Sequence, residues 1–176
     1  NEIKDIILEI STGTDLNKEQ QMIADFYTSF MDTDAANEKG LAPIQPILDS
    51  IAKIENMQDL TEAFGRAWRD GSISPISGGM WFNRLNPDQY QMSIGVSGLG
   101  MPDRSYYLED SERFAGYRAE YVKHIEQMLG FANVADAGDK AQQILALESK
   151  IAAVQWPREK RRNRDLTLNQ VKRDEL

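Results

Sequence analysis

The sequence predicts a mainly α fold, a multi-helix domain with one short β-hairpin at about residues 80–96. Through most of the 176 residues, apolar side chains recur every three or four positions, which is typical of amphipathic helices. This spacing changes only where two short runs of aromatic and β-branched residues flank a turn. The sequence contains no internal repeat and no low-complexity linker. We therefore expect residues 1–176 to form a single helical segment.

Two helices are expected at the start of the chain. The first covers Glu2 to Ile10, with isoleucines at helical spacing, and ends at Gly13. Asn17 begins the second through a capping-box pattern with Gln20. The second helix has a wide apolar stripe. Its members are Met22, Ile23, Phe26, Tyr27, Phe30 and Met31.

Two further helices precede the hairpin. After Gly40 and Pro43, the third helix is expected to bury a row of aliphatic residues, namely Ile44, Ile47, Leu48, Ile51 and Ile54. The fourth runs from Met57 to Trp68, and Gly71 closes it.

The hairpin is predicted from two runs, Met80 to Leu85 and Tyr90 to Val96. Asn86, Pro87 and Asp88 between them are typical turn residues. A loop containing glycine and proline follows from Ser97 to Arg104.

Two long helices are expected in the second half. The fifth helix starts near Asp110 and stops at Gly130. The sixth runs from about Asp139 to Trp156 and is broken by Pro157. Its residues in register are Ile144, Leu147, Glu148, Ile151 and Val154. The basic tail from Arg158 onwards is expected to be irregular.

Composition excludes several classes of function. The net charge of −8 argues against nucleic-acid binding, which needs a basic surface. The chain has no cysteine, so disulfides, thiolate metal sites and cysteine nucleophiles are excluded. No apolar run approaches the length of a membrane span, and no signal peptide opens the chain.

The residues of a zinc hydrolase site are missing. Such a site needs two histidines on one helical face and a carboxylate base. The chain has one histidine, His124, and Met128 stands where a second ligand would be required. We expect His124 to be a surface residue. Ser97 lacks the glycine two positions later that a nucleophile elbow requires. We therefore predict no catalytic, cofactor-binding or metal-binding residue in this chain.

Other patterns also have simple structural explanations. Gly98 to Gly100 begins like a dinucleotide fingerprint, but Asp103 replaces the third glycine. The calcium-loop pattern at Asp32 and Asp34 fails at its obligatory glycine, which favours a solvated helix end. The basic residues are expected to offset acidic neighbours, and the tryptophans to pack in the core. The basic residues are Arg158, Lys160, Arg161, Arg162 and Arg164, and the tryptophans are Trp68, Trp81 and Trp156.

The run from Gly98 to Leu108 resembles a motif of the neprilysin and endothelin-converting enzyme family of zinc metallopeptidases. In that family, a Gly-Leu-Gly-aliphatic-Pro-Asp/Ser-Arg-Asp-Tyr-Tyr run follows a short hairpin. The motif residues in this chain are Gly98, Leu99, Gly100, Pro102, Asp103, Arg104, Tyr106 and Tyr107. Ser105 departs from the pattern, since an acidic residue is usual there. We interpret the motif as structural: Pro102 fixes the turn, Asp103 caps the residues after it, and the tyrosines pack.

Three other stretches resemble the same family in the same order, so the resemblance covers nearly the whole chain. They are Phe26 to Ile44, Ala146 to Ala152, and Trp156 to Leu176. Pro157 departs from the pattern, because a small hydroxyl residue is common there.

The resemblance implies a large, two-lobed zinc metalloendopeptidase that hydrolyses short peptides. This chain would belong to the helical, non-catalytic lobe that restricts access to the metal. Zinc would be bound by the parent enzyme and not by this fragment. Its partners would be the remainder of the peptidase and the peptide substrates. The family implies an extracytoplasmic location, and the absence of cysteine favours a bacterial member over a disulfide-rich eukaryotic ectodomain.

Two alternatives remain open from the sequence. The chain could be a stand-alone helical module that binds peptides or proteins without cutting them, or an unrelated helical interaction domain. The wide stripe between Met22 and Met31 has more large apolar residues than one neighbouring helix can bury. We therefore expect the isolated fragment to self-associate, most simply as a symmetric dimer.

Overall fold

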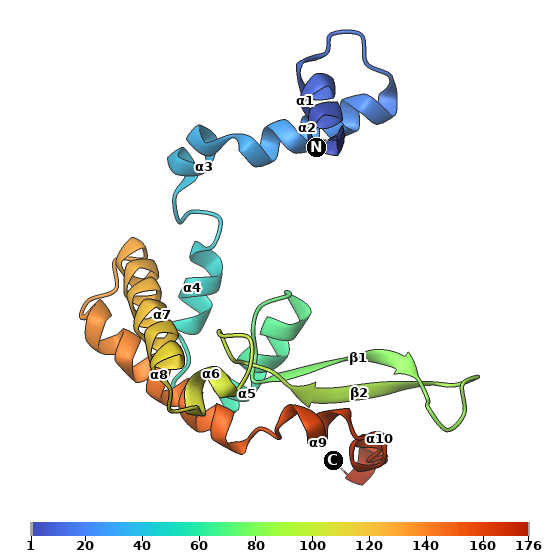
Figure 1. The fold of residues 1–176 in the computed structure, drawn as a ribbon, viewed down its shortest axis with the longest axis vertical. Helices are drawn as coiled ribbons and strands as arrows, with labels where there is room; N and C mark the ends of the chain where they lie inside the picture. The colour runs from blue at the N-terminus through green and yellow to red at the C-terminus, as the bar shows by residue number, and fades with distance from the viewer. Residues whose placement is uncertain (1, 176) are drawn as a thin grey trace. The chain divides into compact units, whose positions relative to one another are not determined.

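The computed structural model describes residues 2–175. In this range the chain forms ten α-helices, one short 3-10 helix and a two-stranded antiparallel sheet (Figure 1). The predicted fold class, mainly α with one hairpin, is confirmed. The chain divides into two compact units, one up to Lys53 and the other from Ile54. Across the described residues, no helix is both long and apolar enough to cross a bilayer.

The first unit begins with two helices packed against each other, α1 (Glu2–Thr12) and α2 (Lys18–Met31). The predicted capping box is present. The Asn17 side chain accepts a hydrogen bond from the backbone N–H of Gln20 at 2.9 Å, and the Gln20 side chain accepts one from the N–H of Asn17 at 3.0 Å. These bonds satisfy two N–H groups that have no partner inside the helix. The start of α2 is therefore determined locally.

Two short helices complete this unit, α3 (Thr33–Lys39) and α4 (Gln45–Ile51). We did not predict α3, because its sequence has no apolar stripe. It begins where the Asp32 side chain accepts a hydrogen bond from the N–H of Ala35, at 2.9 Å. This contact confirms the interpretation of Asp32 as part of a helix end.

The prediction that α4 buries its aliphatic row was wrong. Ile44, Ile47 and Ile51 are 44–56% exposed, and Ile54 lies beyond the end of the helix. The spacing identified the apolar face, but burial needs a second element to cover that face. Among the described residues of this unit, only α1 and α2 form an extensive helix pair.

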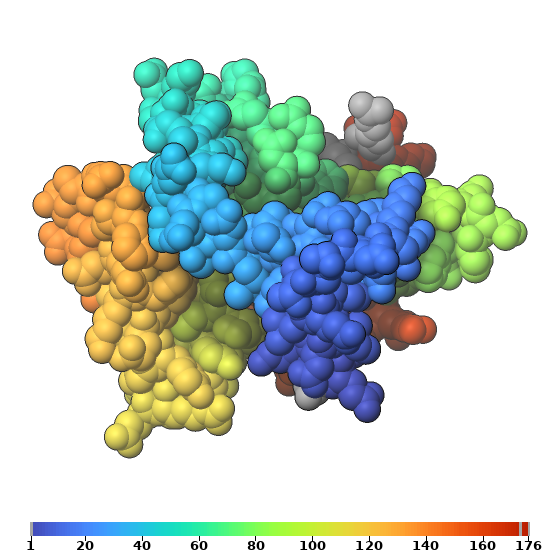
Figure 2. Space-filling view, turned by 90° about the horizontal axis from the view of Figure 1, so that it is seen from above, coloured from blue at the N-terminus to red at the C-terminus, as the bar shows by residue number. Residues whose placement is uncertain are grey.

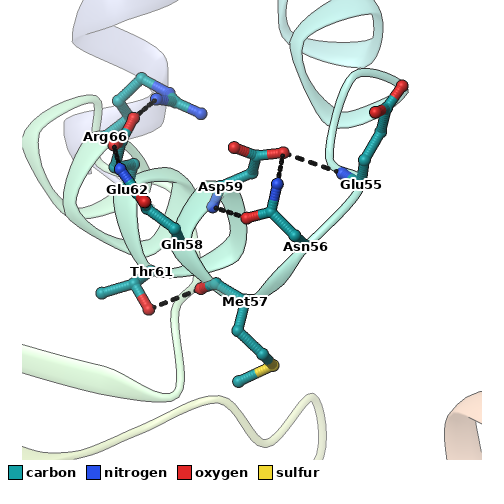
Figure 3. A network of polar contacts seen from close by, with 8 residues as sticks. All are labelled: Glu55, Asn56, Met57, Gln58, Asp59, Thr61, Glu62 and Arg66. Atoms are coloured by element: carbon teal, nitrogen blue, oxygen red, sulfur yellow. Dashed lines mark hydrogen bonds and ion pairs between the residues drawn. The ribbon is translucent and has the colours of Figure 1, made fainter.

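The second unit begins with α5 (Met57–Arg69), whose start is fixed by a compact polar network (Figure 3). The Asn56 side chain accepts a hydrogen bond from the N–H of Asp59 at 3.0 Å and donates one to the Asp59 carboxylate at 2.9 Å. The same carboxylate accepts a third from the N–H of Glu55 at 3.1 Å. An acidic side chain in the first turn also suits the positive end of the helix dipole.

The hairpin consists of β1 (Ile76–Phe82) and β2 (Tyr90–Val96), paired from Ile76 with Val96 to Phe82 with Tyr90. The bounds of β2 are as predicted. In contrast, β1 begins four residues before the predicted Met80, because Gly78 and Gly79 conceal the strand pattern. It also ends before the predicted Leu85. The turn already begins at Asn83, whose side chain accepts a hydrogen bond from the N–H of Leu85 at 2.9 Å.

Three helices follow, α6 (Ser105–Leu108), α7 (Glu112–Phe131) and α8 (Ala137–Val154). The two long ones pack side by side, and α6 packs against both (Figure 1). We did not predict α6, since four residues are too few to show helical periodicity. Ser111 caps α7, and α8 begins two residues before the predicted Asp139.

The prediction of an irregular tail was wrong. Residues 158–175 contain α9 (Arg158–Arg162), α10 (Arg164–Thr167) and a 3-10 turn, η1 (Arg173–Glu175). The Asn163 side chain starts α10 by accepting hydrogen bonds from the N–H groups of Asp165 and Leu166, at 3.0 and 3.3 Å. Both helices are too short for an apolar pattern to predict them.

A small cluster of buried residues lies where the chain enters α6. Met101, Tyr107 and Ala152 are its buried members, with partly buried residues packed around them: Leu99, Tyr106, Tyr121 and Leu145.

The expectation that the tryptophans pack in the core was wrong. All three are 43–58% exposed in this chain. Their positions on apolar faces do not bury them, because those faces are largely uncovered.

Candidate functional site

The motif segment, residues 98–108, connects the hairpin to the long helices. Gly98 opens it with φ +84°, a left-handed conformation in which side chains are strained. A Cβ at this position would lie 2.8 Å from Pro75 Cα. Just before it, the N–H of Ser97 donates a hydrogen bond to the carbonyl of Pro75 at 2.9 Å. Glycine at 98 is therefore required both by backbone conformation and by close approach.

Two tyrosines and one carboxylate form the centre of the site. The Tyr107 hydroxyl donates to Glu148 at 2.7 Å and accepts a hydrogen bond from the N–H of Met101 at 2.8 Å. The Tyr121 hydroxyl lies 3.0 and 3.2 Å from the two oxygens of Glu148. The tyrosine rings meet edge to face, with centroids 6.5 Å apart. This tyrosine–glutamate cluster joins the motif segment to both α7 and α8.

Burial changes the acidity of these tyrosines. Burial, and then the hydrogen bond to Glu148, raise the pKa of Tyr121 from 10.0 to about 12. Burial raises the pKa of Tyr107 even further, and the nearby negative charge of Glu148 acts in the same direction. Both hydroxyls therefore stay protonated at neutral pH and act as donors to the carboxylate.

Gly100 fits directly against this cluster. A Cβ on Gly100 would overlap the hydroxyl of Tyr121 and lie 2.8 Å from its Cζ. No real side chain tolerates such a contact, so a neighbour would have to move. The second glycine of the motif is thus explained by the approach of the segment to α7.

Charged residues hold the outer side of the motif segment. Arg104 Nε donates to the carbonyl of Ala152 in α8 at 3.2 Å. Arg118 of α7 donates to the carbonyls of Tyr106 and Glu109, at 2.9 and 3.1 Å. These hydrogen bonds satisfy carbonyl oxygens near helix ends, where backbone acceptors lack helical partners.

Asp103 links the motif segment to α9. Its carboxylate accepts a hydrogen bond from the N–H of Ser105 at 3.1 Å and pairs with Arg161 at 2.9 Å. The hydrogen bond from Ser105, and to a lesser extent the Arg161 charge, hold the pKa of Asp103 below its ordinary value. The carboxylate is therefore ionised at neutral pH. It satisfies one N–H at the start of α6 while it anchors α9 through Arg161.

A polar cleft of about 430 Å³ lies beside the motif segment. It is lined by Pro102, Asp103, Arg104, Ser105, Tyr106, Glu109, Pro157, Arg158 and Glu159. The lining contains both acidic and basic side chains, so the charge of the cleft favours neither anionic nor cationic ligands. Tyr106 forms its aromatic wall. Its ring meets Phe114 edge to face and lies tilted against Tyr117, with ring centroids 5.1 and 5.5 Å apart.

The contacts described above all hold the backbone of the motif segment in place. All eight predicted motif residues lie in this one region. His124 is exposed on α7, as expected, and Met128 is exposed one turn later. Within residues 2–175, no group of three or more His, Cys, Asp or Glu side chains is placed to hold a metal ion.

Sequence reasoning missed the residues that hold the motif segment from outside. These are Glu148, Tyr121, Arg118, Gln155 and Arg161. For Glu148 a signal existed, since it is an acidic residue in register with the apolar stripe of its helix. Gln155 is buried and donates to the carbonyl of Ser97 at 3.1 Å. Nothing in the sequence distinguishes it from an ordinary surface glutamine.

A protein-family model and several known proteins match this chain. The model of peptidase family M13 matches residues 1–176. Rat endothelin-converting enzyme 1 is 25% identical over 182 residues, covering 97% of this chain and 23% of the enzyme. The bovine enzyme of the same name is 33% identical over 94 residues, covering 52% of this chain and 12% of the enzyme.

Two solved structures share the fold. The zinc metalloprotease Zmp1 of Mycobacterium tuberculosis, crystallised with an inhibitor, is 30% identical with a TM-score of 0.75. The match covers 93% of this chain and 25% of that protein. The open state of Zmp1 gives 31% identity and a TM-score of 0.72. The chain thus spans about a quarter of the length of these relatives. On the match to its entire length, the chain belongs to peptidase family M13.

Proposed function

We propose that this chain is the access-restricting, non-catalytic part of a zinc metalloendopeptidase and that it cannot cleave peptides alone. One observation carries the proposal: the chain matches the family over residues 1–176, yet it contains only one histidine and no cysteine. A hydrolytic zinc site takes three protein ligands. The ligands and the general base would therefore come from parts of the peptidase outside residues 1–176.

The contacts of the motif segment support a structural role within that enzyme. A lobe that restricts substrate entry has to keep its shape while peptides diffuse past it. The tyrosine–glutamate cluster, the Asp103–Arg161 pair and the three arginine–carbonyl hydrogen bonds hold one loop against three helices. The substrates of the complete peptidase would be short peptides, and its location would be extracytoplasmic, as the family resemblance implies.

The experiment compares the isolated chain with the complete peptidase that contains it. After dialysis, elemental analysis is expected to find stoichiometric zinc in the complete peptidase and none in the isolated chain. A quenched fluorescent peptide is expected to be cleaved only by the complete peptidase. The His124→Ala variant of the isolated chain tests whether any trace of zinc depends on the single imidazole. Stoichiometric zinc in the isolated chain, or cleavage that survives purification, would contradict the proposal.

A second candidate is a stand-alone helical module that holds peptides or proteins without cutting them. The open apolar faces of the chain and the cleft beside the motif segment favour it. The gene separates the two candidates. A His-Glu-x-x-His helix encoded several hundred codons downstream in the same reading frame supports the peptidase, and a stop codon soon after residue 176 supports the module.

A further inference from the structure

The β-hairpin has one apolar face and one polar face. Paired residues of an antiparallel ladder point to the same side, and successive pairs alternate. One face therefore carries the pairs Ile76–Val96, Gly78–Ile94, Met80–Met92 and Phe82–Tyr90. The other carries Ser77–Gly95, Gly79–Ser93 and Trp81–Gln91. The seven large side chains of the apolar face are 46–77% exposed.

The chain's own tail lies on the polar face. The Gln170 side chain donates to Asn83 at 2.9 Å and reaches Gln91 at 3.0 Å. Gln91 pairs with Trp81 on the polar face, and Asn83 directly follows the end of β1. Arg84, at the turn, adds a 3.4 Å hydrogen bond to the hydroxyl of Thr167. Residues 167–170 thus contact the polar side and leave the apolar side open.

One helix already covers part of the apolar face. The indole of Trp68, from α5, lies 3.1 Å from where a Cβ of Gly78 would be, so glycine makes room for the ring. From Gly78 to Phe82 the strand continues for roughly 13 Å at about 3.3 Å per residue. A helix with its side chains is about 10 Å across. The uncovered stretch therefore has room for one more helix beside α5. In Figure 2, the turn end of the hairpin, in light green, extends beyond that helix.

The chemistry and size of this face indicate what kind of partner it fits. Neither strand contains a charged residue, although the chain has a net charge of −8. Two strands of this length cover only a few hundred Å² or so. A free protein partner normally needs about 800 Å² on each side. A helix tethered in the same polypeptide needs much less, because its effective concentration is high.

We propose that the open half of this apolar face packs against a helix contributed by the rest of the peptidase. That helix carries an uncharged apolar stripe and lies beside α5, so that the two helices form one layer over the hairpin. This inference rests on the proposed function only in assigning the helix to the same polypeptide. A two-stranded hairpin on its own is marginally stable in water, which gives the covering helix a structural purpose.

The test uses the complete peptidase with a photoreactive benzophenone amino acid at position 92 or, as the matched control, at position 93. Met92 and Ser93 are neighbours on opposite faces of β2. Position 92 is expected to form cross-links within one polypeptide, mapped by mass spectrometry to a helix outside residues 2–175. Position 93 is expected to give none to that helix. Cross-links from position 92 that join two copies, that reach only an unrelated extended segment, or that are absent would overturn the proposal.

Thermal unfolding gives a second measurement on the same protein. Met92→Lys is expected to lower the Tm by several degrees, because it places a charge under the helix, and Ser93→Lys to leave the Tm within about one degree. Equal shifts from both variants would contradict a covered apolar face. Peptide cleavage by the unmodified protein is measured separately. A mapped intramolecular cross-link in a protein without zinc-dependent cleavage would reject the proposed function and leave this inference standing.

Discussion

Glu148 shows how one residue can organise a whole segment. It accepts hydrogen bonds from two tyrosine hydroxyls that come from different helices, while one of those hydroxyls also accepts the N–H of Met101. A partly buried carboxylate is stable only when such donors replace the water it loses. The apolar core of this region is small, so these directional contacts fix the position of residues 98–108. The position of residues 98–108 therefore depends more on the tyrosine–glutamate hydrogen bonds and on the close approach of the glycines than on the volume of the apolar core.

The acidity of Tyr121 predicts how stability depends on pH. Its pKa is raised from 10.0 to about 12 in the folded chain, so the unfolded chain loses this proton at lower pH. The corresponding stabilisation is complete below about pH 10 and is lost as the pH rises towards 12. Tyr121→Phe should therefore reduce the fall in the free energy of unfolding between pH 9 and pH 12, as measured by urea denaturation. An unchanged slope in Tyr121→Phe would refute the role assigned to this hydroxyl.

The close contact of Gly100 with Tyr121 leads to a second prediction about a single residue. Gly100→Ala introduces a methyl group that overlaps the Tyr121 hydroxyl and should destabilise the protein by about 1–3 kcal/mol. Removal of that hydroxyl in Gly100→Ala/Tyr121→Phe should recover part of the loss, because only the ring then remains too close. Gly116→Ala, on an open part of α7, should be neutral or slightly stabilising. Strict additivity of the two changes in denaturant unfolding would show that they do not interact.

At the scale of elements, single long-range contacts join short helices to their neighbours. The α9 helix has five residues, too few to be stable alone, and it is linked to the motif segment through Asp103 and Arg161. These side chains are 22% and 38% exposed, so solvent screens part of the attraction. The pair therefore orients α9 more than it stabilises the whole chain.

Neighbouring arginines provide a matched test of this link. Arg161→Ala should increase hydrogen exchange in residues 158–167 and cost up to about 1 kcal/mol of stability, an effect that high salt reduces. Arg162→Ala removes the same charge from the next position, and its side chain makes no such pair with Asp103. It should leave exchange in this region unchanged. Equal exchange in the two variants would mean that general charge, and not the ion pair, holds α9.

At the scale of the whole molecule, the chain leaves much of its apolar surface uncovered. On α2, five of the six residues of the predicted stripe are 43–79% exposed, with Phe26 and Phe30 the most open. Exposed apolar patches beyond a few hundred Å² are unusual in soluble monomers. Each large side chain kept in water forfeits on the order of 1.5–3 kcal/mol relative to burial.

We therefore predict that the isolated chain self-associates or binds a hydrophobic dye, in spite of its charge of −8. A symmetric dimer is the expected species in analytical ultracentrifugation at micromolar concentration. Phe26→Asp/Phe30→Asp should lower both dimer content and dye fluorescence, whereas Thr28→Asp on the same helix should not. A monomer that binds no dye would mean that the chain covers its own apolar faces, which would strengthen the alternative of a stand-alone module.

Local signals in the sequence determined the fold class, the strand β2, the capping box of α2 and the extents of α5 and α7 to within a few residues. These features depend on contacts within about four residues or on a repeated pattern, so the sequence contains them directly. The same reasoning selected the motif residues and led to the prediction that this chain contains no zinc site. Family membership followed from that motif and is shown by the match over residues 1–176.

Only the tertiary structure decided which apolar faces are covered and what holds the motif segment. Ile44, Ile47 and Trp81 have the pattern of core residues but remain exposed, because the pattern gives a face and not the element that covers it. Glu148 and Arg161 reach the motif segment, and Gln155 reaches Ser97 directly before it, across 41, 58 and 58 positions of sequence respectively. Such contacts depend on how distant elements come together, and no local rule of spacing or propensity encodes that.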